Sequence, residues 1–132
     1  MRYLIDTNTC IYIMNKRPAD VIKKFKQFEP GDISISSITV SELQCGVEQS
    51  SHPKKNRLRL EEFMAPFKIL PYDAFAAKTY GTIRFQLEEQ GHPIGPLDLL
   101  IAAHALSQEL ILVTNNDKEF KRINNLKVEN WA

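Results

Sequence analysis

The stretch Arg2–Asn8, RYLIDTN, decides the fold that the sequence predicts. Tyr3, Leu4 and Ile5 form a short apolar run that ends abruptly at Asp6, and polar residues follow it. A buried strand of a parallel sheet has this pattern, because both of its faces are covered. Ligands bind at the carboxyl edge of open α/β sheets. Asp6 therefore either takes part in chemistry at that edge or only caps the next helix, as Asp often does.

The composition is that of an ordinary globular domain. Of the 132 residues, 43% are hydrophobic and 25% are charged, and the net charge is +1. This size fits one domain, residues 1–132. The net charge does not indicate a nucleic-acid binder, but two groups of basic residues stand out. Such groups can contact phosphates and are more often solvated helix faces. They are Lys16, Arg17, Lys23, Lys24 and Lys26, and Lys54, Lys55, Arg57 and Arg59.

The cysteines and histidines suggest neither a disulfide framework nor a zinc site. Cys10 and Cys45 are the only cysteines, and the three histidines lie far apart. The sequence shows no signal peptide and no apolar run of the roughly 18 residues that a membrane span needs. We therefore expect reduced thiols, a cytoplasmic location and no membrane partner.

Strand and helix patterns alternate along the chain. Strands are expected at residues 33–36, 67–70 and 110–113, with a short last one within 127–131. Helices are expected at 9–15, 19–28, from 39 through 47, from Pro53, from Asp73 to Gly91 and at 97–106. The helix from Asp73 is expected to bury a stripe that includes Phe75, Thr79, Ile83 and Leu87. Thr39 and Glu42 have the spacing of a capping box. The alternation predicts a three-layer α/β domain whose small, mainly parallel sheet is flanked by helices.

Acidic and amide residues fall at four places that this fold brings to one edge. Asp6 ends the first strand, and Glu42 and Asp98 lie in the first turns of the helices expected at 39–47 and 97–106. Asn116 and Asp117 belong to the polar stretch TNND after the strand 110–113. Crossover helices run antiparallel to their strands, so their first turns lie over the carboxyl edge.

Each of these residues also has a purely structural explanation. Glu42 fits a capping box, Asp98 suits a helix N-terminus, and Asp117 could cap a short helix at residues 118–123. Several carboxylates at one edge repel one another, however, and such clusters are usually kept for cations. Oxygen ligands suit Mg²⁺ and Mn²⁺. The residues themselves thus favour a metal-dependent phosphodiesterase.

The chain also resembles a family. The segments that carry the likeness are LIDTNTCIY (4–12), SSITVSELQCG (36–46), GPLDLLIAAHA (95–105), LILVTNNDKEFKRI (110–123) and LKVENW (126–131). In this order and spacing they resemble the PIN-domain ribonucleases, specifically the VapC-type toxins of bacterial toxin–antitoxin pairs. The likeness spans nearly the whole chain.

The resemblance implies a Mg²⁺- or Mn²⁺-dependent endoribonuclease, with a tRNA as one candidate substrate. It also implies a cognate antitoxin and a homodimer. Carried over by position, Asp6 and Asp98 are the main metal ligands, Glu42 completes the cluster, and Thr114 and Asn116 position water or phosphate. The family commonly has an acid near Asn116. Asp117 is the candidate fourth acid, and Glu119 stands two residues further on.

Two other functions fit parts of the sequence. A haloacid-dehalogenase-like phosphatase fits Asp6 and Thr9 but needs an acid where the chain has Asn8. A non-catalytic PIN-like domain that only binds RNA or protein is the stronger alternative. Loss of one of the first three acids would be its expected mark, and Asp6, Glu42 and Asp98 are all present.

Overall fold

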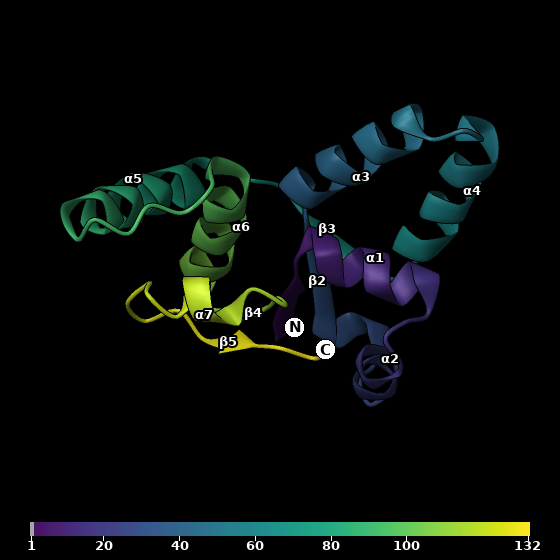
Figure 1. The fold of residues 1–132 in the computed structure, drawn as a ribbon, viewed down its shortest axis with the longest axis horizontal. Helices are drawn as coiled ribbons and strands as arrows, with labels where there is room; N and C mark the ends of the chain where they lie inside the picture. The colour runs from purple at the N-terminus through teal and green to yellow at the C-terminus, as the bar shows by residue number, and fades with distance from the viewer. Residues whose placement is uncertain (1) are drawn as a thin grey trace.

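Strand β1, Tyr3–Ile5, lies at the centre of a five-stranded parallel sheet of order β3-β2-β1-β4-β5. The computed structural model describes residues 2–132 and is drawn in Figure 1. The other strands are β2 (Ile33–Ser36), β3 (Lys68–Leu70), β4 (Ile111–Val113) and β5 (Val128–Glu129). The helices are α1 (Thr7–Asn15), α2 (Ala19–Phe25), α3 (Ser37–Gln49), α4 (Pro53–Met64), α5 (Ala74–Glu89), α6 (Pro96–Ser107) and α7 (Asp117–Phe120), with a short 3-10 helix at Pro30–Asp32.

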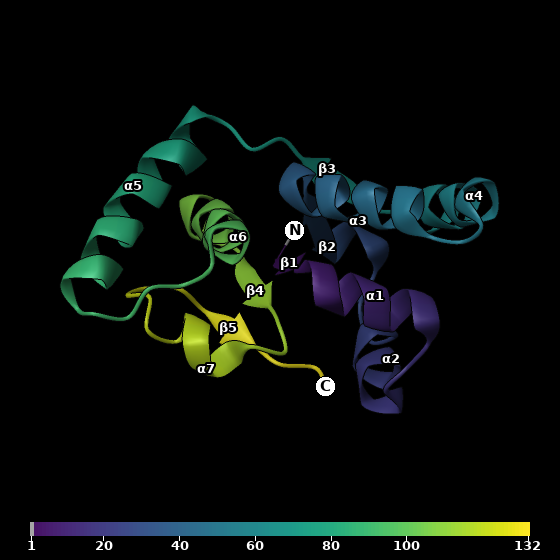
Figure 2. The same cartoon turned by 45° about the horizontal axis from the view of Figure 1, so that its top comes forward.

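Helices cover both faces of the sheet, which confirms the predicted α/β class. Successive residues of a strand point to opposite faces, so β1 contributes to two cores. Leu4 packs with buried residues of α5 and α6, such as Ile83 and Ile101. Tyr3 and Ile5 pack on the other side with residues of the first four helices. Figure 2 shows α5 and α6 on one side of β1 and α1 to α4 on the other.

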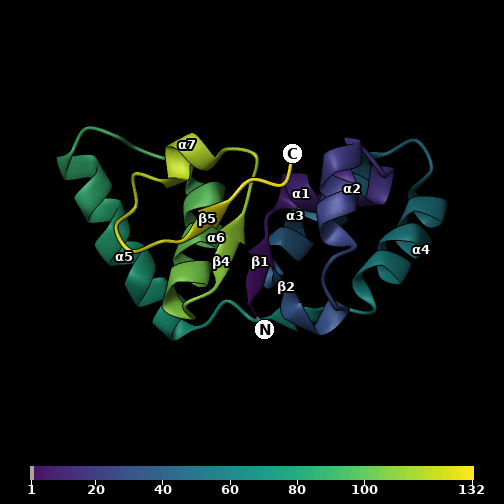
Figure 3. The same cartoon turned by 90° about the horizontal axis from the view of Figure 1, so that it is seen from below.

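All strands run in one direction, so their carboxyl ends share one edge. Figure 3 shows the chain's N-terminus at the opposite end from the start of α1, with α2, α7 and the C-terminus gathered at the end where α1 begins. Tyr3 pairs with Ile33 and with Ile111, which fixes the register of the three central strands. None of the helices within residues 2–132 is long and apolar enough to cross a membrane.

Three local expectations were wrong. Ser36, not Thr39, caps α3, because its hydroxyl accepts the Ile38 N–H at 3.1 Å. Glu42 accordingly lies in the second turn of α3 and not in the first. Helix α2 ends at Phe25 instead of residue 28. Phe75, expected on the buried stripe of α5, has an exposed fraction of 61%, and Ala76 is buried instead.

Candidate active site

The Asp6 carboxylate is a helix cap and also lies at the carboxyl edge of the sheet. Its side chain caps α1, since Oδ1 accepts the Thr9 N–H at 2.8 Å. Its backbone N–H donates to the Val113 carbonyl at 3.0 Å, which holds the end of β1 against β4. The carboxylate is buried at the carboxyl edge of the sheet. Capping uses one carboxylate oxygen and leaves the other available at that edge.

Glu42 is held close to the end of β1 by a hydroxyl. Thr7 Oγ1 donates to Glu42 Oε1 at 2.6 Å and lies 3.3 Å from Thr39 Oγ1. Thr7 has a single hydroxyl proton, so the buried Thr39 must donate to Thr7 for both bonds to exist. The chain of two hydroxyls fixes one oxygen of Glu42. The residue after Asp6 thus positions the second acid of the cluster.

Asp98 lies in the first turn of α6, which Gly95 caps and Pro96 starts. Loss of hydration raises the pKa of the Asp98 carboxyl, and the negative charges of Asp6, Glu119 and Glu42 raise it further. Three carboxylates from other parts of the chain, those of Asp6, Glu42 and Glu119, therefore lie close enough to repel Asp98. None of the four forms an ion pair with another described residue. The edge carries negative charge that the protein itself does not compensate.

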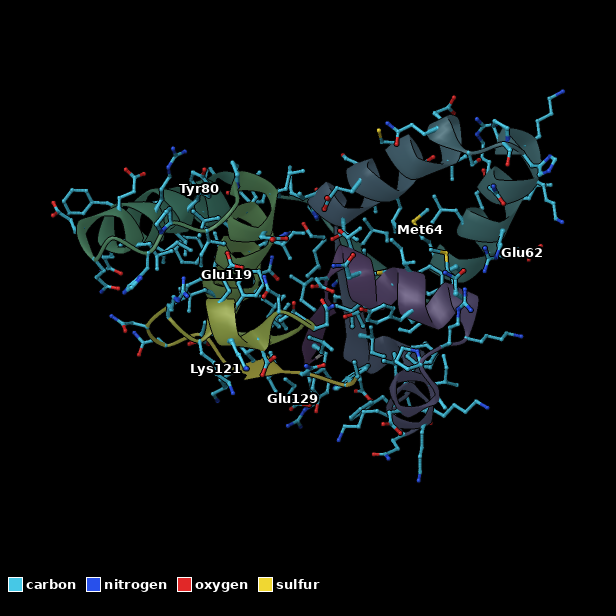
Figure 4. All side chains as sticks on the ribbon, viewed as in Figure 1. Glu62, Met64, Tyr80, Glu119, Lys121 and Glu129 are labelled. Atoms are coloured by element: carbon cyan, nitrogen blue, oxygen red, sulfur yellow. The ribbon has the colours of Figure 1, made fainter. Side chains whose placement is uncertain are left out.

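The polar stretch after β4 directs Glu119 toward this cluster. Thr114 is buried, and its Oγ1 accepts the Asn116 N–H at 3.0 Å. The Asn116 side-chain amide in turn donates to Glu119 Oε2 at 2.5 Å. Figure 4 shows Glu119 on the side of α7 that faces α6, with Lys121 on the opposite side. Thr114 and Asn116 are thus where the sequence placed them, beside the acids.

Asp117 lies away from the cluster. It is the first residue of α7, and Asn116 occupies the capping position instead. Its carboxylate accepts a hydrogen bond from the Asn130 amide at 3.2 Å and pairs with Lys121 at 3.5 Å. Partial burial raises the pKa of Asp117, but the bond from Asn130 and the charge of Lys121 outweigh this effect and lower it. Glu119 was not predicted as the fourth acid, although its spacing from Asn116 brings both side chains onto one helix face.

The other singled-out side chains are structural. His104 is fully buried, with Nδ1 2.7 Å from Ser36 Oγ, and burial lowers its pKa. Burial raises the pKa of Cys10, and the charge of Asp6 raises it further. Cys10 packs among the apolar side chains between the sheet and the first four helices, whereas Cys45 is exposed on α3. Both thiols are free.

The carboxylate oxygens at this edge are chemically suited to bind a hard divalent cation. Carboxylate oxygens are the ligands that Mg²⁺ and Mn²⁺ prefer. Burial is the main cause of the raised pKa of Asp98, and the neighbouring negative charges add to it. Asp6, Glu42 and Glu119 each have one oxygen held by a hydrogen bond from a neighbouring residue. Within residues 2–132, no three acidic, histidine or cysteine side chains converge closely enough to form a ready-made metal site.

Comparisons with known proteins show the family of this chain. The family model for the PIN domain matches residues 3–126. The chain is similar to the "tRNA(fMet)-specific endonuclease VapC" of Shigella flexneri, 42% identical over 100% of this chain and 99% of that protein. It is 43% identical, with the same coverage, to "Ribonuclease VapC2" of Haemophilus influenzae. Among solved structures, VapBC2 of Rickettsia felis bound to a promoter DNA fragment gives a TM-score of 0.92 at 41% identity, covering 100% of both chains.

The chain therefore belongs to the PIN-domain family. Within that family its likeness, over the full length, is to the VapC-type toxins. Both the fold and the family expected from the sequence are confirmed.

Proposed function

We propose that this protein is a Mg²⁺- or Mn²⁺-dependent endoribonuclease and the toxin of a toxin–antitoxin pair. One observation carries the proposal: Asp6, Glu42 and Glu119 lie near enough to Asp98, at the carboxyl edge, for their charges to act on it, and no ion pair among residues 2–132 compensates the four carboxylates. A protein gains nothing in stability from such repulsion. The cluster is explained if it binds cations and, through them, the phosphates of a nucleic acid.

Asp6 and Asp98 would hold the cation, with Glu42 and Glu119 binding directly or through water. When bound, a divalent cation supplies an activated water and stabilises the charge that develops on a phosphodiester. Thr7 keeps Glu42 oriented toward the edge, and Asn116 does the same for Glu119. Asn116 and the backbone around Thr114 are placed to hold a water or a phosphate oxygen. Fixed orientation of this kind lowers the cost of reaching the transition state.

The substrate we propose is RNA, and specifically a tRNA, because the Shigella flexneri relative is named for tRNA(fMet). Cytoplasm is then the expected location. The test is cleavage of a tRNA by the purified chain with Mn²⁺ and with EDTA, next to a phosphomonoester. We expect cleavage that EDTA abolishes, and at least about a hundredfold loss in Asp98→Asn. Undiminished cleavage in Asp98→Asn would remove the assignment.

The alternative is a PIN-like domain that only binds RNA or protein. Nothing at the edge favours it, since Asp6, Glu42 and Asp98 are all present and Glu119 joins them. RNA binding without cleavage at any cation concentration would establish it. Hydrolysis of the phosphomonoester alone would instead point to a phosphatase.

A groove beside the acids suits the antitoxin partner. It has a volume of about 210 Å³ and lies between α1, α3 and α4. Its apolar lining includes Ile11, Leu43 and Leu60, and it ends at Thr7 and Glu42. A segment bound here would reach the acidic edge, where an Arg or Lys could meet the carboxylates. The Rickettsia felis structure, a VapBC2 complex, supports a partner for this chain as well.

Gly46 allows the groove to be filled selectively. It lines the groove, and a Cβ at this position would meet nothing within 4 Å. We expect Gly46→Leu to weaken neutralisation by the cognate antitoxin while leaving RNA cleavage in place. Cys45→Leu is the matched control, because Cys45 is exposed on the same helix and does not line the groove. Full neutralisation of Gly46→Leu would exclude this groove.

A homodimer is also proposed from the resemblance. Large apolar side chains on α5 and at the start of α6 are exposed and support it: Phe75, Phe85 and Leu97. Sedimentation equilibrium tests the proposal, and a monomer at all concentrations would contradict it.

A further inference from the structure

Positive charge is concentrated at the end of α1 and on helix α2, and it does not pair with the carboxylates of the edge. Five of the 17 Lys and Arg residues lie between residues 16 and 26, with Asp20 the single acid among them. We name this surface the α2 basic patch: Lys16, Arg17, Lys23, Lys24 and Lys26. Within the described residues, no member of the patch forms an ion pair. Lys24 lies over the Phe28 ring, 5.7 Å from its centroid, and the other four are exposed.

Local folding accounts only in part for the basic residues of the patch. Positive charge suits the C-terminal ends of α1 and α2, where Lys16, Lys23 and Lys24 lie. Lys16 has a φ of 57°, in the left-handed region, and glycine or asparagine suits that conformation better than lysine. The charged ends of Lys16, Arg17 and Lys23 have no carboxylate partner among the described residues.

The patch lies on the face of the molecule that carries the acids. Figure 3 shows α2 at the same end as the start of α1 and α7. Lys16 follows Asp6 by ten residues, nearly all in α1, so their backbones are about 15 Å apart at 1.5 Å per residue. Lys23 and Lys24 also line a surface hollow of about 310 Å³ with Asn130 and Trp131, which Asp20 and Glu129 border.

The other basic group has structural partners. Arg57 pairs with Glu48, and Arg59 donates to the Met14 carbonyl and to Asn15 Oδ1. Lys54 and Lys55 are exposed at the far start of α4. The two groups thus differ. Arg57 and Arg59 have polar partners within the fold, whereas no member of the α2 basic patch pairs with a carboxylate among the described residues.

We propose that the α2 basic patch binds backbone phosphates of RNA on one side of the cleaved bond. The inference rests on the proposed function, which makes RNA the substrate. A polyanion approaching four carboxylates is repelled, and cations a few nucleotides away offset this repulsion and set the direction of the strand. The contacts are to phosphates, so they position the RNA without selecting its sequence.

The test compares two double variants that each remove two exposed positive charges. Lys16→Asn/Lys23→Gln changes the patch, and Lys54→Gln/Lys55→Gln is the matched control. Binding of a fluorescently labelled single-stranded RNA is followed by anisotropy in EDTA, where cleavage is suppressed, over a series of salt concentrations. We expect the patch variant to bind more weakly and the slope of log affinity against log salt to become shallower by about 1.4, that is 0.7 for each lost phosphate contact. The control keeps the wild-type slope.

Equal affinity of wild type and the patch variant, or equal losses in both double variants, overturns the inference. Equal losses would mean that RNA binding depends only on the net charge of the protein. Cleavage with Mn²⁺ is measured separately on the wild type. A wild type that binds through the patch but does not cleave supports the patch and removes the nuclease assignment. If the wild type cleaves RNA but the patch variant changes neither the affinity nor the salt slope, the nuclease assignment stands and the inference about the patch is wrong.

Discussion

At the scale of single residues, Ser34 is the one buried side chain among the described residues whose polar atom has no partner. It lies in β2 beside Leu4, fully buried. A buried hydroxyl without a hydrogen bond costs about 1–3 kcal/mol. We therefore expect Ser34→Ala to raise the free energy of unfolding by about 1 kcal/mol, measured by urea denaturation. Ser36→Ala is the contrast, since Ser36 caps α3 and contacts His104, and should cost about 1–2 kcal/mol. Equal effects of the two changes would contradict this.

His104 makes the stability depend on pH. Burial lowers its pKa from the ordinary value of 6.5, although the charge of Asp73 opposes the shift. Below 6.5 the unfolded chain binds a proton at this position that the folded chain does not. The free energy of unfolding should therefore fall as the pH drops through 6.5, and His104→Gln should lose part of that dependence. Urea denaturation on both sides of 6.5 measures it, and an unchanged slope in the variant would rule out this cause.

At the scale of elements, α7 decides which acid joins the cluster. Because the helix begins at Asp117, Glu119 faces α6 while Asp117 pairs with Lys121. We expect Glu119→Gln to lower RNA cleavage at least about tenfold, and Asn116→Ala to lower it because Glu119 loses its hydrogen bond. Asp117→Asn should cost about 0.5 kcal/mol or less of stability and leave the rate nearly unchanged. If Asp117→Asn lost most of its RNA cleavage and Glu119→Gln stayed active, Asp117 and not Glu119 would be the fourth acid.

The same element shows what the sequence could not predict. The order of strands and helices follows from apolar runs and turn signals, and it brought Asp6, Glu42 and Asp98 to one edge correctly. In a helix of a single turn, such as α7, the residue at which the helix begins decides which side chains face the neighbouring helix. No periodic pattern in the sequence is long enough to predict that residue. Ser36 and Thr39 illustrate the same limit, because both can cap a helix and only the end of β2 decides between them. Phe75 was assigned to the core from its spacing alone, and α5 is rotated so that Ala76 faces inward.

At the scale of the whole molecule, charge is divided between two regions of one face. The acids gather where β1, α3, α6 and α7 meet, and the α2 basic patch lies beyond the far end of α1. The net charge of +1 conceals this division. An RNA strand lying across the face would meet both regions, and the apolar groove along α1 is open to a protein segment. If the proposed function holds, a partner that covers this single face would inhibit the enzyme.

Cation binding tests the central claim most directly. Titration calorimetry with Mn²⁺ is carried out on EDTA-treated wild type and on Asp98→Asn. We predict that the metal-free wild type binds one cation tightly and acquires a second only with an RNA phosphate as an added ligand, and that Asp98→Asn binds Mn²⁺ at least about tenfold more weakly. The variant should unfold at the same or a higher temperature without metal, because a repelling charge is gone. Wild-type affinity for Mn²⁺ in Asp98→Asn, or no binding by the wild type, would contradict the claim that these carboxylates form a metal-dependent nuclease centre.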